Sequence, residues 1–245
     1  MELRHNFPSP SSAVESRLLA EYGAIFVTKA APPPKIIFGN EAEVLAFQES
    51  LDIRRAQIGT YPIETQSVAM LALEAAVDLA AVNGISITAR SADSGRRSFQ
   101  DTLSLWLRNV GRGLDHWIGL GRITAQQAQS IRELDFTEQV GAVLDMEESQ
   151  GIYFSTYFDK SILCSVAAPG ASQHLSLLAF DIAEYQDEKA EAILGSQGWY
   201  RTVVSDLPHF SYIGHSEDAL PGLGLRVTVR KENSRMYRFW IPDLI

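Results

Sequence analysis

The sequence predicts an α+β fold, and three patterns carry that prediction. Apolar side chains recur at helical spacing over residues 64–83 and again after residue 98. Apolar and polar residues alternate with period two over residues 85–90, and two strand-like segments flank a polar turn between residues 223 and 241. No βαβ unit repeats along the chain, so we expect a mixed fold rather than a parallel sheet.

Composition limits the classes of partner. The chain has 245 residues, 46% of them hydrophobic, which is enough for one substantial core. Its formal net charge of -9 argues against binding to nucleic acid or to an anionic membrane, because both need a basic face. The apolar stretches are far shorter than the roughly 20 residues of a membrane span, so we expect no span. A peptide or a small molecule is the more suitable substrate.

The single cysteine, Cys164, excludes an intramolecular disulfide. It lies in an apolar run at residues 161–168, so we expect it to be a buried packing residue. The N-terminus shows no basic segment followed by an apolar one, so no secretory signal can be read from it.

Proline and serine set the N-terminal part of the chain apart from the rest. Residues 1–16 are rich in both, and residues 31–35 read Ala-Pro-Pro-Pro-Lys. We therefore expect residues 1–35 to form a loose arm and a Pro-rich spacer, and residues 36–245 to form a single domain.

Within that domain, helix and strand signals alternate at first. The helix of residues 64–83 should be followed by a strand at residues 85–89. A loop then leads into a second helix, which Ser98 and Asp101 can cap and Gly111 should end.

The rest of the domain begins with a helical insertion at about residues 111–150, in which one helix opens at Thr124. The patterns downstream predict strands at residues 153–158, 162–167 and 200–204, a short helix at residues 187–194 and a terminal hairpin at residues 223–241.

Two short segments combine histidine with aspartate. His174 is followed by Asp181, and His209 is preceded by Asp206. Imidazole and carboxylate are both zinc ligands, and two histidines with one aspartate leave a fourth position for water. A histidine near an aspartate is also typical of a simple hydrogen-bonded pair, so the spacing alone leaves both interpretations open.

The first of these segments resembles a known motif. Residues 172–181 are similar to S-x-H-x-x-G-x-A-x-D, a signature of the VanY-like D-alanyl-D-alanine peptidases. The matching residues are Ser172, His174, Ala179 and Asp181. Leu177 stands where the family has glycine, which could change the backbone path or narrow the cleft.

Two further segments resemble the same family. Residues 206–214 are similar to E-x-W-H-F-x-Y-V-G, with matches at His209, Phe210, Tyr212 and Gly214. Asp206 replaces the glutamate, as in the D-x-P-H-F motif of the related L-alanyl-D-glutamate endopeptidases. Upstream, residues 94–100 resemble the loop S-G-Y-R-S-Y-Q, which aligns Arg97 with the substrate-facing arginine of the family.

The resemblance implies a fold of the hedgehog/DD-peptidase type, with a small antiparallel sheet flanked by helices. It implies that zinc is held by His174, Asp181 and His209. By the same resemblance, Asp206 is the general base, and Arg97 binds substrate and stabilises the oxyanion. Ser172 is also expected to bind substrate and to steady the site.

The implied function is zinc-dependent hydrolysis of peptidoglycan stem peptides outside the cytoplasm, foremost as a D-alanyl-D-alanine carboxypeptidase. An L-alanyl-D-glutamate endopeptidase is one alternative. A non-catalytic, zinc-containing module that binds the cell wall is another. Leu177 favours that module, whereas Asp206 and Arg97 oppose it, because a structural metal site needs neither a base nor a carboxylate clamp. Within the site, His215 is an alternative ligand and Glu184 an alternative proton carrier.

Overall fold

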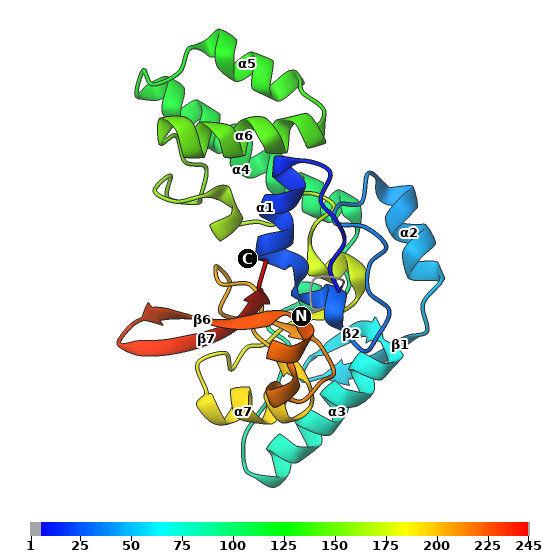
Figure 1. The fold of residues 1–245 in the computed structure, drawn as a ribbon. Helices are drawn as coiled ribbons and strands as arrows, with labels where there is room; N and C mark the ends of the chain where they lie inside the picture. The colour runs from blue at the N-terminus through cyan, green and yellow to red at the C-terminus, as the bar shows by residue number, and fades with distance from the viewer. Residues whose placement is uncertain (1–5, 245) are drawn as a thin grey trace.

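The structure is a computed structural model and describes residues 6–244. It mixes helices with small antiparallel sheets, so the predicted α+β class is confirmed (Figure 1). The α-helices are α1 Ala13–Tyr22, α2 Glu41–Glu49, α3 Ser67–Val82, α4 Phe99–Gly119, α5 Ala125–Glu133, α6 Phe136–Gln150 and α7 Glu188–Ser196. The strands are β1 Ile53–Ile58, β2 Tyr61–Gln66, β3 Ala179–Asp181, β4 Trp199–Tyr200, β5 His209–Tyr212, β6 Leu225–Glu232 and β7 Arg235–Pro242.

A three-stranded antiparallel sheet with the order β3-β5-β4 organises the middle of the molecule, while β1-β2 and β6-β7 form separate hairpins. Across β3 and β5, Asp181 pairs with His209 and Phe180 pairs with Phe210. Because successive side chains of a strand point to opposite faces, the two phenylalanines enter an apolar core with Trp199. Asp181 and His209 therefore share the other face.

Two large apolar clusters support these elements. One packs α3 and α7 against the sheet and includes Leu73, Phe180 and Leu194. The other joins α1, α4 and α6 and includes Leu18 and Trp106. Figure 1 shows α4, α5 and α6 gathered at one end of the molecule and α3 and α7 at the other. Within residues 6–244, no helix is both long and apolar enough to cross a membrane.

The expectation of a loose N-terminal arm is wrong for residues 13–27, which form α1 and the 3₁₀ helix η2 (Gly23–Val27). Tyr22 is buried in the helical cluster and Ile25 in the sheet cluster, so apolar burial outweighs the proline and serine content nearby. The Pro-rich segment is also tied down, because Ala31 exchanges two backbone hydrogen bonds of 2.9 and 2.8 Å with the Gln66 side chain. Residues 1–5 of the expected arm lie outside the described residues.

The strands expected at residues 153–158 and 162–167 are not formed; the chain there is irregular apart from the short 3₁₀ helix η4 (Ile162–Cys164). Phe154 and Ile162 are buried, as their apolar pattern implied. However, the Glu147 carboxylate accepts hydrogen bonds from their backbone N–H groups, at 3.0 and 2.7 Å. A side chain thus satisfies the donors that a neighbouring strand would otherwise bind, and no ladder is required.

Three other expected boundaries are wrong. Residues 85–89 contribute only an isolated bridge between Ala89 and Ile182. Gly111 does not end α4, which continues to Gly119, because burial of side chains such as Leu114 outweighs the roughly 1 kcal/mol that a helical glycine costs. The strand expected at residues 200–204 stops at Tyr200, since the Arg201 carbonyl next accepts a hydrogen bond from Trp240.

Other elements follow the sequence patterns closely. The helix expected at residues 64–83 is α3, the insertion contains α5 opening at Thr124, and residues 187–194 correspond to α7. The terminal hairpin is β6-β7. The β1-β2 hairpin was not predicted.

Leu177 lies between the ligand candidates His174 and Asp181 and has a left-handed backbone, with φ of 55° and ψ of 32°. This is the conformation that glycine adopts most easily, and here a leucine adopts it. The Leu177 side chain is fully buried. The left-handed backbone costs about 1–2 kcal/mol for a residue with a Cβ, and side-chain burial offsets that cost.

We predict that Leu177→Gly destabilises the protein by about 1–3 kcal/mol. Loss of a buried leucine side chain costs about 2–5 kcal/mol, which exceeds the backbone relief. Urea unfolding measures the difference. Ser234→Gly is the matched control, because Ser234 also has a positive φ, of 67°, but is exposed in the β6-β7 turn. Ser234→Gly should leave the free energy of unfolding unchanged or raise it. A Leu177→Gly variant as stable as the parent would show that burial of the leucine side chain does not outweigh the cost of its backbone conformation.

Candidate metal centre

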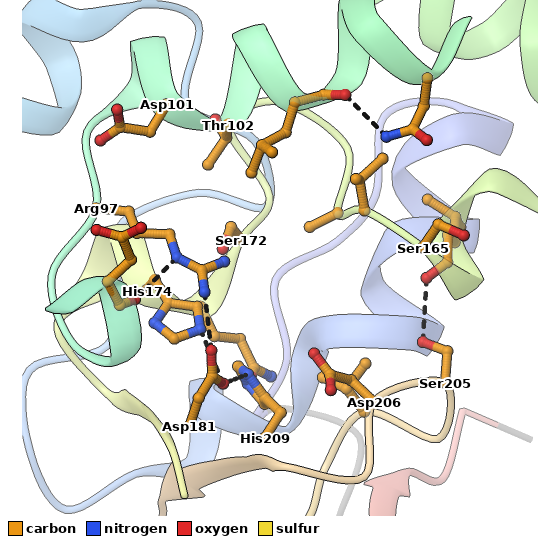
Figure 2. A pocket seen from close by; sticks show the side chains of 18 of the residues that line it. Arg97, Asp101, Thr102, Ser165, Ser172, His174, Asp181, Ser205, Asp206 and His209 are labelled. Carbon is orange, nitrogen blue, oxygen red and sulfur yellow. Dashed lines mark hydrogen bonds and ion pairs between the residues drawn. The ribbon is translucent and has the colours of Figure 1, made fainter. Parts of the chain in front are cut away.

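Three side chains from three elements converge on one point. Asp181 and His209 face each other across β3 and β5, and His174 comes from the 3₁₀ helix η5 (Gln173–Ser176), which precedes β3. All three residues are buried, and their possible ligand atoms lie within 4.8 Å of one another. Figure 2 shows the two imidazole rings pointing toward the Asp181 carboxylate.

A backbone carbonyl fixes the tautomer of His174. Its Nδ1 lies 2.6 Å from the Gly95 carbonyl oxygen, which can only accept a hydrogen bond, so Nδ1 carries the proton. Nε2 therefore presents its lone pair to Asp181 Oδ1, 3.3 Å away. Burial lowers the pKa of His174 to about 4, which keeps the ring neutral near pH 7.

Gly95 can approach this site only because it lacks a side chain. A Cβ added there would lie 2.7 Å from Ile63 Cγ2 and 2.8 Å from the Glu64 carbonyl oxygen, both in β2. Glycine thus lets the loop before α4 lie against β2 and present its carbonyl to His174.

A side-chain amide fixes the tautomer of His209 in the same way. Gln173 Nε2 donates to the Tyr22 carbonyl at 2.7 Å, which orients the amide so that Oε1 lies 2.8 Å from His209 Nε2. His209 Nε2 is therefore the donor, and Nδ1 faces Asp181 Oδ1 at 3.1 Å with its lone pair. Thr202 and Ser211 also donate to Gln173 Oε1, so the amide is held within a buried network.

These contacts leave two imidazole lone pairs and one carboxylate oxygen facing each other. Three acceptors in a buried position repel one another unless a cation lies between them. Two nitrogens and one carboxylate oxygen form the ligand set of an open metal site, with one position left for water or substrate. The residues present therefore fit a divalent metal ion held by His174, Asp181 and His209.

Arg97 lines the pocket, but it also contacts a candidate ligand. Its Nη2 lies 2.8 Å from Asp181 Oδ2, and its Nε donates to the Asp93 carbonyl at 3.1 Å. Its side chain is about 24% exposed, so part of the guanidinium still faces the pocket. Arg97 thus orients Asp181 and is also available to a bound molecule. The sequence pattern did not reveal its contact with Asp181.

The candidate centre opens into a pocket of about 820 Å³, and Asp206 and Ser172 lie on its wall. Within residues 6–244, no side chain donates a hydrogen bond to the Asp206 carboxylate, and Figure 2 shows it on the pocket side of the chain near His209. Asp206 is exposed on this wall, and partial loss of hydration there raises the pKa of its carboxyl, an effect that nearby His209 opposes and the charge of Asp181 reinforces. Ser172 is buried apart from its face toward the pocket.

The alternative site residues are engaged elsewhere. Both Glu184 carboxylate oxygens accept hydrogen bonds from Thr88, at 2.8 and 2.7 Å, so Glu184 is a structural cap. His215 does not line the pocket, and its carbonyl accepts the Tyr200 hydroxyl. The expectation that Cys164 is buried is wrong, because η4 turns this residue outward to the pocket wall, where it is exposed.

The sequence patterns missed the residues behind the ligands. Gln173 occupies a variable position of the first motif, and nothing in the sequence connects it with the Tyr22 carbonyl 151 positions away. Ser211 was also missed, but a sequence signal for it exists: it follows His209 by two positions in a strand and so lies on the same face.

Comparisons with protein-family models, with curated proteins and with solved structures gave no match to this chain.

Proposed function

We propose that this chain is a zinc-dependent peptidase that hydrolyses peptidoglycan stem peptides, foremost as a D-alanyl-D-alanine carboxypeptidase. One observation carries the proposal. His174 Nε2, His209 Nδ1 and Asp181 Oδ1 converge with their acceptor sites facing inward, beside a pocket that also contains the unpaired carboxylate of Asp206. An imidazole-rich ligand set favours zinc over magnesium or calcium, which prefer oxygen ligands.

The motif resemblance supplies the substrate class. Ser172, Arg97 and Asp206, to which it gave roles beside the metal, line the same pocket as the proposed ligands. On this basis we also propose a fold of the hedgehog/DD-peptidase type and an extracytoplasmic location, where peptidoglycan is found. The left-handed bend at Leu177 supports the alignment at its one departure from the first motif.

The proposed mechanism assigns separate tasks to the residues of the pocket. A zinc ion bound at this centre would lower the pKa of its water from about 16 to about 7 and polarise the scissile carbonyl. Asp206 is placed to accept a proton from the attacking water on a carboxylate oxygen and to return it to the leaving amine.

Arg97 and Ser172 would hold the substrate. The part of the Arg97 guanidinium that faces the pocket can donate to a carbonyl or carboxylate oxygen, while the Asp181 contact keeps the arginine in place. Ser172 directly precedes η5, and its hydroxyl can donate a further hydrogen bond to the substrate.

Mass spectrometry of defined muropeptides after incubation with the zinc-loaded protein tests the function. Loss of the terminal D-alanine supports the carboxypeptidase. Cleavage between L-alanine and D-glutamate would instead favour the endopeptidase, to which the Asp-x-Pro-His-Phe pattern at residues 206–210 is similar. Absence of any product would favour the non-catalytic module and overturn the proposal.

We predict about one zinc per chain in the purified protein and loss of that zinc in His174→Ala, Asp181→Ala and His209→Ala. Three protein ligands leave little redundancy, so each replacement should remove most of the affinity. Elemental analysis of dialysed samples measures the content. His215→Ala is the control and should retain zinc, whereas full occupancy in His209→Ala would show that the site lies elsewhere.

Asp206→Asn should lower turnover by about 100- to 10,000-fold, the usual contribution of a general base, while zinc content stays constant. Asp206→Glu should keep measurable activity, because the VanY-like motif has glutamate there. Both rate and metal are measured on the same samples. Undiminished activity in Asp206→Asn would remove this residue from the mechanism.

Gln173→Leu should weaken zinc binding by about 10- to 100-fold, because His209 Nε2 would lose the acceptor that fixes its tautomer. Competition with a zinc chelator measures the affinity. Thr202→Val is the matched control: Thr202 is also buried and donates a hydrogen bond to Gln173, but it forms no hydrogen bond with His209. If both variants bind zinc equally tightly, Gln173 is only a packing residue.

A further inference from the structure

Two arginines of α4 line the pocket without an acidic partner. Most arginines of the described chain pair with a carboxylate, but the exposed Arg108 and Arg112 have none within residues 6–244. Arg90 lines the same pocket and also has no carboxylate partner there, but it lies over the Tyr185 ring. The acidic residues of α4 are bound elsewhere. Asp101 caps the helix through Ser98, and Asp115 pairs with Arg132 at 2.5 Å. In a chain with a net charge of -9, these two arginines give one wall of the pocket a positive charge.

The geometry of α4 directs both side chains to one wall. Leu105, Arg108 and Arg112 are three and four residues apart, so they follow one stripe of the helix, and all three line the pocket. Like charges four residues apart destabilise a helix slightly, which makes a bound anion favourable at this place. Two contacts hold the Arg112 side chain in place. Its guanidinium lies 5.8 Å from the centre of the Phe158 ring, and its Nη2 lies 3.5 Å from the Thr156 carbonyl oxygen.

We propose that Arg108 and Arg112, the α4 arginine pair, bind a carboxylate of the substrate at a distance from the scissile bond. This inference rests on the proposed peptidase function and narrows its substrate to an acidic peptide. Guanidinium groups suit carboxylates because their planar donors can bind two oxygens at once.

The spacing sets where that carboxylate lies in the peptide. Arg97, which contacts Asp181, lies just before α4, and Arg108 is nine residues beyond the start of the helix. Nine residues of helix rise about 14 Å. The reach of the arginine side chain shortens this distance of about 14 Å. Because an extended peptide advances about 3.3–3.6 Å per residue, the acidic residue should lie about two to four residues from the cleaved bond.

Calorimetric titration with two matched pentapeptides tests the subsite. One is a stem peptide whose D-glutamate has a free α-carboxylate, and the other is the same peptide with that carboxylate amidated. Binding is measured in the full-length Asp206→Asn protein, so that the peptide is not consumed. We expect the carboxylate form to bind about tenfold more tightly or better, since a hydrogen bond to a charged group is stronger than one to an amide.

Arg108→Gln with Arg112→Gln should abolish this preference while leaving the amidated peptide bound as before. Arg122→Gln is the control, because Arg122 also has no carboxylate partner among the described residues but stacks on Trp117 outside the pocket. Equal binding of the two peptides by the Asp206→Asn parent, or a preference that survives the double change, would overturn the subsite. If the carboxylate peptide binds more tightly but the wild-type protein hydrolyses neither peptide, the carboxylate subsite is supported and the peptidase function is rejected.

Discussion

The antiparallel pairing of β3 with β5 is the constraint on which the site depends. Its register sets Asp181 directly opposite His209 and, one position along, Phe180 opposite Phe210. Because side chains alternate between the faces of a strand, a slip of one residue in a single strand would turn its polar side chain into the apolar core. Burial of the two phenylalanines therefore specifies the register, and the register brings a carboxylate and an imidazole together.

Hydrogen bonds from the surrounding chain also determine which ring nitrogen of each histidine carries the proton. The Gly95 carbonyl and the Gln173 amide each accept a hydrogen bond from the outer nitrogen of one histidine, which turns the inner nitrogens into acceptors. The direction of the Gln173 amide depends in turn on the Tyr22 carbonyl of α1. A helix from the N-terminal part of the chain thus influences an imidazole near the C-terminal part, and packing of α1 into the helical core is part of what shapes the site.

Local patterns predicted the features that depend on neighbours in sequence. The α3 helix and the β6-β7 hairpin belong to this class, because each lies in a short segment with a clear period. The grouping of His174, Asp181 and His209 came from the motif resemblance, since spacing alone left it open, and the structure brings the three residues together. Features that depend on distant partners were not predictable. Glu147 satisfies the backbone of Phe154 and Ile162 and so replaces a strand, and no pattern in residues 153–167 could have shown this.

Leu177 illustrates how a motif can change a residue and keep its geometry. The chain must turn between η5, which carries His174, and β3, which carries Asp181, and the turn has a left-handed residue at its corner. A glycine could make such a corner without strain. Here the leucine side chain is fully buried, so the free energy of burial exceeds the cost of the backbone conformation. The position is therefore constrained by the bend, and either glycine or a well-packed leucine can satisfy it.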